Sequence, residues 1–336
     1  MWRWTGAHLC GHHTPHLPAS GHVPRARRRQ EDSVDRAERW NRFMCRVGRQ
    51  AAVLRSMTVR DTRHAMQVAE QAARAGMAVI QQALTPTSRR PTDAADSVAF
   101  KGAVDLVTQT DLAAEAAVCA VLEQMTPGIP VLAEERGGAT QATTRWIVDP
   151  LDGTTNFVHG FPHFAVSVAL EVDGVLEAGC IADPRAASVA IAGRNQGATL
   201  DGQPLRVSST RTLDQSLFLT GFAYDRRERP DFYLSRVRTA LVAGQGLRRC
   251  GAATHDFLHI AAGRADVYWE FSLGAWDVAA GILLVSEAGG MVTDLSGASV
   301  NIARPQILAT NGWVHEAALA LLGIESHSPS ASREKA

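Results

Sequence analysis

A block of short strands in the middle of the chain constrains the fold more than any other feature of the sequence. Strand-like stretches follow one another at residues 165–171, 175–183, 187–192 and 216–221. In the first of them Val166, Val168 and Leu170 alternate with other residues, as expected for a strand with two distinct faces. Gly, Asp and Pro residues separate the stretches, as in tight turns. Residues 174–205 are therefore predicted to form consecutive antiparallel hairpins.

Helical stretches come before and after this block and do not alternate with its strands. Apolar residues recur at helical spacing from Arg63 to Leu84, and Pro86 closes the run. A second helix is predicted up to Met125, with Thr110 or Asp111 as its N-cap. Further helices are predicted at residues 231–242, 252–262 and 276–288, and short strands at 146–148, 247–250 and 266–270. Strands and helices in blocks predict a layered α+β fold with mixed or antiparallel sheets.

The composition is that of a globular protein whose partner is a small molecule. The chain has 336 residues, of which 46% are hydrophobic, and its acidic and basic residues balance at 34 each. It can bury a large core, and its charge does not indicate a nucleic-acid or membrane partner. Five scattered cysteines without a CxxC pair argue against a zinc site or a disulfide framework and favour the cytoplasm. The sequence has no apolar run long enough to span a bilayer.

Residues 1–56 differ from the rest of the sequence. They contain eleven Arg, no Lys and no sustained helical or strand period. We expect a disordered tail or a non-native extension, with the natural chain starting at Met57; a transit peptide is a second option, which the acids in this segment weaken. The His-rich stretch 8–16 has irregular spacing, which argues against a metal site. One folded domain is predicted at 57–325 and a disordered tail at 326–336.

The stretch WIVDPLDGTTNF, residues 146–157, places two acids where an apolar strand ends. Pro150 keeps Asp149 on extended chain, and a turn after it would let Asp152 aim back at the same point. Two carboxylates around one turn can share a hard divalent cation. The backbone N–H groups of residues 153–155, at a predicted helix start, can bind an anion. The same residues would also make a simple capped turn, so this stretch alone leaves both readings open.

Other acids lie at similar junctions between elements. Glu134 and Glu135 follow an apolar strand-like run, Asp277 stands at the start of a predicted helix, and Asp111 at the start of another. A lone acid at such a position is usually a helix cap. Several of them together favour one shared carboxylate site.

These motifs resemble those of the inositol monophosphatase family, within the lithium-sensitive, magnesium-dependent phosphatases. The resemblance extends from about Met57 to about Gly323. It rests on the motifs at residues 104–111 (VDLVTQTD), 132–135 (LAEE), 146–162, 251–281 and 287–290 (EAGG). It implies a layered αβαβα sandwich of the sugar-phosphatase type and a homodimer.

The resemblance also implies the ligands of two to three Mg²⁺ ions. Glu134, Asp149 and the Leu151 carbonyl would hold one ion. Asp149, Asp152 and Asp277 would hold the second. Glu134 would reach a more weakly held third ion through water.

The remaining implied roles concern catalysis and substrate. Thr154, hydrogen-bonded to Asp111, would orient the water that a metal activates for in-line attack on phosphorus, and Glu134 joins them in the catalytic set. The substrate would contact Asp152, Gly153, Thr154, Ala253, Glu270 and Asp277.

The function implied is Mg²⁺-dependent hydrolysis of myo-inositol monophosphate or another small phosphorylated polyol, with no need for a membrane or nucleic acid. Alternatives are a 3′(2′),5′-bisphosphate nucleotidase, a fructose-1,6-bisphosphatase, or a non-catalytic regulatory binding protein. Residues 155–157 (TNF) favour the inositol phosphatase type. Clustered acids repel one another without a metal, which argues against the non-catalytic alternative.

Overall fold

A computed structural model describes residues 61–84, 99–100 and 106–322, all within one compact unit. The predictions made for residues 1–56 and 326–336 lie outside the described residues, so the proposed domain limits stay predictions. The helices are α2 (Thr62–Ala83), α3 (Gln109–Met125), α4 (Thr154–His159), α5 (Pro230–Ala243), α6 (Ala253–Ala261), α7 (Ala275–Glu287) and α8 (His315–Leu322).

The strands of the described residues form two main sheets and a short β1–β2 pair. The larger sheet has the order β10-β9-β8-β7-β6-β5-β3-β4, and the smaller has the order β12-β11-β13-β15-β14. The strands are β1 (Ala99–Phe100), β2 (Leu106–Val107), β3 (Val131–Ala133), β4 (Gly137–Gly138), β5 (Thr144–Asp152), β6 (Ala165–Val172), β7 (Val175–Asp183), β8 (Ser188–Gly193), β9 (Gly197–Leu200), β10 (Gln203–Pro204), β11 (Leu217–Thr220), β12 (Gly246–Arg248), β13 (Val267–Glu270), β14 (Met291–Thr293) and β15 (Ile307–Thr310). The run from β5 to β10 is antiparallel throughout, which confirms the predicted hairpins.

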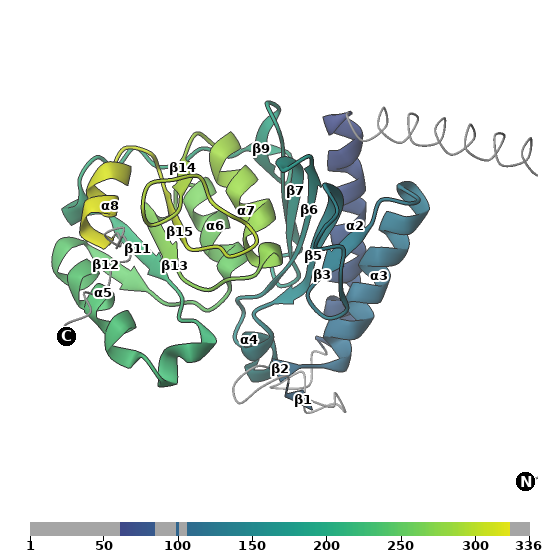
Figure 1. The fold of residues 1–336 in the computed structure, drawn as a ribbon, viewed down its shortest axis with the longest axis horizontal. Helices are drawn as coiled ribbons and strands as arrows, with labels where there is room; N and C mark the ends of the chain where they lie inside the picture. The colour runs from purple at the N-terminus through teal and green to yellow at the C-terminus, as the bar shows by residue number, and fades with distance from the viewer. Residues whose placement is uncertain (1–60, 85–98, 101–105, 323–336) are drawn as a thin grey trace, which may run out of the picture. The chain divides into compact units, whose positions relative to one another are not determined.

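Helices α2 and α3 lie side by side against the outer face of the larger sheet (Figure 1). On β6, Val166 and Val168 join the core under these helices, whereas Ala165 and Ala169 join the core on the opposite face. The strand is buried on both faces, and its alternating side chains serve two different cores.

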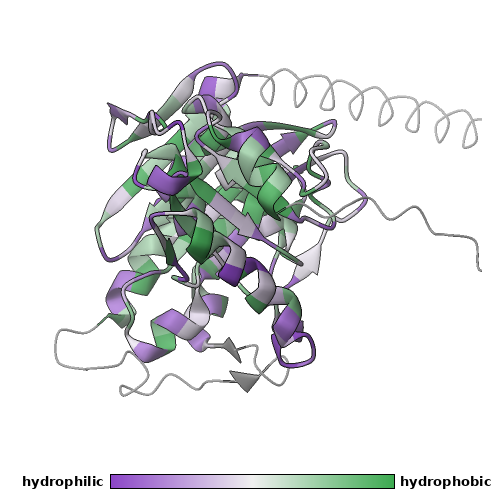
Figure 2. Cartoon of the chain, turned by 90° about the vertical axis from the view of Figure 1, so that its left-hand side faces the viewer, coloured by the Kyte–Doolittle hydropathy of each residue, from purple (hydrophilic) through white to green (hydrophobic). Residues whose placement is uncertain are grey.

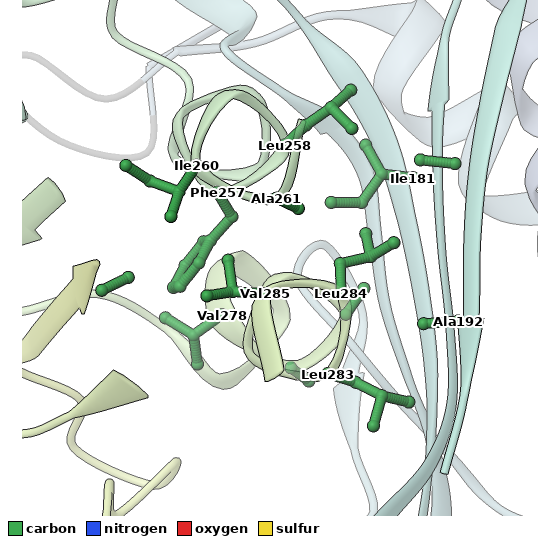
Figure 3. Close-up of a cluster of buried hydrophobic side chains, with 14 of the residues drawn as sticks. Ile181, Ala192, Phe257, Leu258, Ile260, Ala261, Val278, Leu283, Leu284 and Val285 are labelled. Carbon is green, nitrogen blue, oxygen red and sulfur yellow. The ribbon is translucent and has the colours of Figure 1, made fainter. Parts of the chain in front are cut away.

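Helices α6 and α7 form the middle layer, between the two sheets (Figure 3). Phe257 of α6 and Leu284 of α7 are fully buried there. Gly281 lets the two helices approach closely, because a Cβ at this position would lie 2.3 Å from the Phe257 ring. This layer positions the starts of both helices beside the end of β5.

Helices α5 and α8 lie on the far side of the smaller sheet and complete the αβαβα order (Figure 1). The predicted layered α+β fold is confirmed. Apolar segments gather in the inner helices and strands, and hydrophilic segments lie on the outer turns (Figure 2). Within the described residues, no helix is both long and apolar enough to cross a bilayer.

The predicted N-cap of α3 is wrong. The cap is Thr108, whose side chain accepts hydrogen bonds from the N–H groups of Thr110 and Asp111. Asp111 in turn accepts from the N–H of Thr108 at 2.9 Å. This reciprocal capping box satisfies more of the helix's first N–H groups than a cap at either later residue would, so the helix begins earlier.

Candidate active site

Strand β5 carries two acids of the site and is irregular between them. Asp149 is paired with Ser167 of β6, and Asp152 with Ala165, so the register shifts between the two acids. Pro150 has no N–H to donate, which favours a break in the ladder at this point. The predicted turn is therefore wrong in form, because the strand continues through a bulge as far as Asp152.

The bulge brings these two carboxylates together with a third. Ligand oxygens of Asp149, Asp152 and Asp277 lie within 4.8 Å of one another. Glu134 follows β3, which runs parallel to β5 beside it, and lines the same pocket. The pocket includes every residue that the sequence suggested as a metal ligand: Glu134, Asp149, Leu151, Asp152 and Asp277.

Two of the three acids also cap helices. Asp152 Oδ2 accepts from Thr254 N at 2.7 Å and from Thr254 Oγ1 at 2.5 Å, in the first turn of α6. Asp277 Oδ2 accepts, at 2.6 Å, from the backbone N–H that precedes α7. Asp149 differs, since among the described residues its Oδ1 accepts from the nearby Leu151 N at 3.0 Å and its side chain caps no helix.

The carboxyl groups raise one another's pKa. Burial raises the pKa of Asp149 well above its usual value, and the charges of its acidic neighbours raise it further. Burial likewise raises the pKa of Asp277, and Asp152 and Glu134 add to the effect. A hard divalent cation would remove this repulsion, and magnesium prefers oxygen ligands of this kind. The residues present therefore fit a magnesium site.

A threonine beside the acids is held in a fixed orientation. Thr154 Oγ1 lies 2.9 Å from Asp111 Oδ1 and 3.1 Å from the Leu151 carbonyl oxygen. Asp111 is fully buried, and its other oxygen accepts from Thr108 N and Thr108 Oγ1. The predicted hydrogen bond between Thr154 and Asp111 is present, and the buried carboxylate has little freedom to move.

The start of α4 forms another wall of the pocket. Gly153 has φ of 89°, and a Cβ there would lie 2.9 Å from the His163 carbonyl oxygen, so only glycine fits. The N–H of Phe157 makes the first hydrogen bond within the helix, to the Gly153 carbonyl at 3.0 Å. The N–H groups of residues 153–155 have no such partner within α4, and these residues line the pocket.

Glu270 and Ala253 lie on the same pocket, as the sequence suggested for substrate contacts. Tyr268 Oη donates to Glu270 Oε2 at 2.8 Å. Burial raises the pKa of Glu270 to about 8, although this hydrogen bond opposes the rise. The cavity measures about 190 Å³, which suits a small molecule.

Sequence reasoning missed the basic and aromatic residues of the pocket. Arg226, Arg249, Phe222 and Tyr224 line it, and the Arg249 guanidinium lies 5.4 Å from the centre of the Phe222 ring. The two cationic side chains can attract an anionic ligand. Metal cations bound by the carboxylates would neutralise the acids beside it. The pair Arg248-Arg249, which Cys250 separates from the 251–281 motif, is a signal that could have pointed to Arg249.

Comparisons with known proteins agree with this geometry. A family model described as the inositol monophosphatase family matches residues 61–326. A Nus factor SuhB of Pseudomonas aeruginosa is 42% identical over 239 residues, which are 69% of this chain and 88% of that protein. An inositol-1-monophosphatase of Synechocystis is 40% identical over 220 residues, 63% and 75% of the two chains. The crystal structure of the extragenic suppressor protein suhB from Bartonella henselae has 37% identity and a TM-score of 0.69, covering 77% of this chain and 98% of that one.

Proposed function

The chain belongs to the inositol monophosphatase family and is a phosphomonoesterase, and from this premise we propose that it hydrolyses myo-inositol monophosphate, or a closely related phosphorylated polyol, with magnesium as cofactor. One observation carries the proposal. Three carboxylates lie within 4.8 Å of one another, in the pocket that also contains the Thr154–Asp111 pair.

The carboxylates have the roles that the family resemblance implies. Glu134, Asp149 and the Leu151 carbonyl would hold one Mg²⁺ ion, and Asp149, Asp152 and Asp277 would hold a second. Glu134 would also reach a third, more weakly held ion through water. Magnesium, when bound, neutralises phosphate charge, lowers the pKa of water and stabilises the leaving oxygen. Asp149 would be a ligand to both of the first two ions.

Thr154 orients the attacking water. Its hydroxyl donates a hydrogen bond to Asp111 Oδ1, with the two oxygens 2.9 Å apart, so a lone pair of Thr154 Oγ1 can accept a hydrogen bond from water in the pocket. That water then presents its own lone pair to phosphorus. The N–H groups at the start of α4 receive phosphate oxygens, and Asp111 keeps the Thr154 hydroxyl from rotating.

The polyol binds on the Glu270 side of the pocket. The Glu270 carboxyl has one oxygen occupied by Tyr268, and the other can bond a sugar-alcohol hydroxyl. Ala253, at the start of α6, contacts the ring. We further propose the homodimer that the resemblance implies and the cytoplasmic location that the scattered cysteines favour.

A panel of phosphomonoesters tests the substrate. With Mg²⁺, kcat/KM is expected to be highest for inositol monophosphate, and Li⁺ is expected to inhibit by occupying a cation site. A much higher kcat/KM for a 3′,5′-bisphosphate nucleotide or for fructose 1,6-bisphosphate would show that this compound, and not inositol monophosphate, is the preferred substrate. Complete indifference to Li⁺ would count against the proposed cation site.

At pH 9, where Glu270 with its pKa of about 8 is ionised, replacing Glu270 by Gln is expected to lower kcat/KM for inositol monophosphate by roughly 10- to 100-fold, the value of a hydrogen bond to a charged group. The kcat/KM for an aryl phosphate, which has no polyol hydroxyls, should fall much less. The exposed Glu316 on α8 gives a matched control, since Glu316→Gln should leave both rates unchanged. An equal loss on the two substrates would show that Glu270 does not recognise the polyol.

A regulatory role is the second candidate, because one relative is named a Nus factor and not an enzyme. The two functions are separable. If the chain acts only as a binding protein, a variant without phosphatase activity should complement a deletion strain as well as the unaltered chain does. Loss of complementation together with activity would favour the enzyme.

A further inference from the structure

Three histidines that the proposed catalysis does not use lie close together, two of them on α6 and one beside it. His163 lies between α4 and β6, while His255 and His259 are one turn apart on the same face of α6. One ring nitrogen from each of the three lies within 4.8 Å of the other two. The rings of His163 and His255 have their centres 4.3 Å apart, at 76°.

The first pair has the spacing of two ligands on one ion. His163 Nδ1 and His255 Nδ1 are 3.2 Å apart. Two nitrogens on a tetrahedral zinc ion, each at 2.0–2.1 Å from the metal, are separated by about 3.3 Å. Without an ion the two Nδ1 atoms share a hydrogen bond at this distance, and an ion that displaced its proton could bind both nitrogens with little movement of the rings.

The outward nitrogens of the same two rings face carboxylates. His163 Nε2 lies 3.8 Å from Asp256 Oδ1, and His255 Nε2 lies 3.5 Å from Asp183 Oδ2. Histidines that bind metal in proteins almost always direct their second ring nitrogen to a carboxylate, a carbonyl or a water. This arrangement would fix each ring with Nδ1 toward the ion.

The cluster contains buried polar atoms without hydrogen bonds. Within the described residues, His163 Nε2, His255 Nε2, His259 Nδ1 and both carboxylate oxygens of Asp256 have no hydrogen-bond partner. His255 is 5% exposed and Asp256 is completely buried. Unsatisfied buried groups cost about 1–3 kcal/mol each, and an ion held at the Nδ1 atoms would fix the ring protons at Nε2, where they can donate to Asp183 and Asp256.

The charge state of the cluster suits a cation. Burial lowers the pKa of His255 to about 3 and that of His259 to about 4, so both rings are neutral at physiological pH. Neutral imidazole is the form that binds metals. Burial also raises the pKa of Asp256 well above its usual value, and a nearby cation would stabilise its charged form.

We propose that His163, His255 and His259 form a second metal site, for a transition ion such as Zn²⁺. Its nitrogen donors distinguish it from the oxygen-only carboxylate site, because imidazole favours zinc over magnesium. The ion joins the segment before β6 to α6. It therefore stabilises the helix whose first turn holds Asp152.

The test measures metal equivalents on the untagged full-length chain in excess Mg²⁺. Zn²⁺ is added, unbound metal is removed, and zinc per chain is determined. His255→Gln/His259→Gln should bind one equivalent fewer than the unaltered chain. The histidines at residues 8–16 are common to both proteins, so they cancel in the difference. His159→Gln removes an exposed histidine at the end of α4 and should bind as much zinc as the unaltered chain.

Two further readouts separate a metal site from a packing role. Co²⁺ in this site should give the intense visible bands of a four-coordinate nitrogen environment, and the double variant should lose them. Asp256→Asn, which keeps all three imidazoles, should weaken binding by on the order of 10- to 100-fold. Circular dichroism and Mg²⁺-dependent activity check that each variant is folded.

Two results would overturn the proposal. One is equal zinc in the unaltered chain and the folded variants, including the single variant His259→Gln. The other is a cobalt spectrum in the unaltered chain that shows only the weak bands of six-coordinate oxygen ligands. The second result needs no variant, so it stands even if the double variant does not fold.

Discussion

Asp149→Asn is expected to lower kcat by roughly 10³-fold or more at any practical Mg²⁺ concentration, because the shared carboxylate contributes several kcal/mol at about 1.4 kcal/mol per tenfold change. The amide is nearly the same size, and Asp149 caps no helix, so the fold should survive. Metal-free Asp149→Asn should melt at the same temperature as the unaltered protein or higher, since one charge leaves a repelling cluster.

Steady-state kinetics across a wide Mg²⁺ range and thermal melts in chelator test this prediction together. Asp214→Asn removes an exposed carboxylate from the turn before β11 and serves as the matched control. Near-normal turnover by Asp149→Asn would refute the shared ligand. A loss of activity accompanied by a much lower melting temperature would assign Asp149 to the fold instead.

The metal-free protein is expected to lose stability as pH rises from 6.5 to 9. Burial raises the folded-state pKa of Asp149, Asp277 and Glu270 above the unfolded values, the last to about 8. Each such group contributes full stability below its unfolded pKa, and this contribution is lost as pH rises through its folded pKa. The buried histidines have lowered pKa values and act in the opposite direction, but only below about pH 6.5.

Magnesium should reverse this loss. At 100 times its dissociation constant it should add about 2.7 kcal/mol at pH 9, or about 5–10 °C in melting temperature. The gain should be smaller at pH 6.5, where protons compete for the same oxygens. Calorimetry with and without Mg²⁺ at both pH values measures this gain in stability. Asp149→Asn should reduce the loss of stability that the metal-free protein shows between pH 6.5 and 9. A metal-free protein that becomes more stable across this interval would contradict the prediction.

The sequence predicts that the acids lie at the ends of elements, because this part of the pattern is local. Asp149 and Asp152 stand at the end of an apolar run, and Asp277 at the start of a helix, so periodicity and spacing alone place them at element ends. That they lie close together depends on the order of the strands, which only the structure shows.

Other features depend on tertiary contacts that periodicity does not report. Strands β14 and β15 have three and four residues, too few for a recognisable alternation, and neither is predicted. The histidine cluster joins His163 to a residue 92 positions later, and nothing in either local pattern links them. The bulge after Asp149 is a shift in the pairing of β5 with β6, so the sequence of β5 alone does not report it.

Two of the site carboxylates also cap helices, and this affects which residues can show that a related chain is an active enzyme. Asp152 holds the first turn of α6, and Asp277 holds that of α7, so a descendant that had ceased to be an enzyme would still need both to fold well. Their presence in such a chain would say little about its chemistry. Among the described residues, the Asp149 side chain caps no helix. The residue at this position therefore distinguishes an active phosphatase from a related chain that has lost its activity.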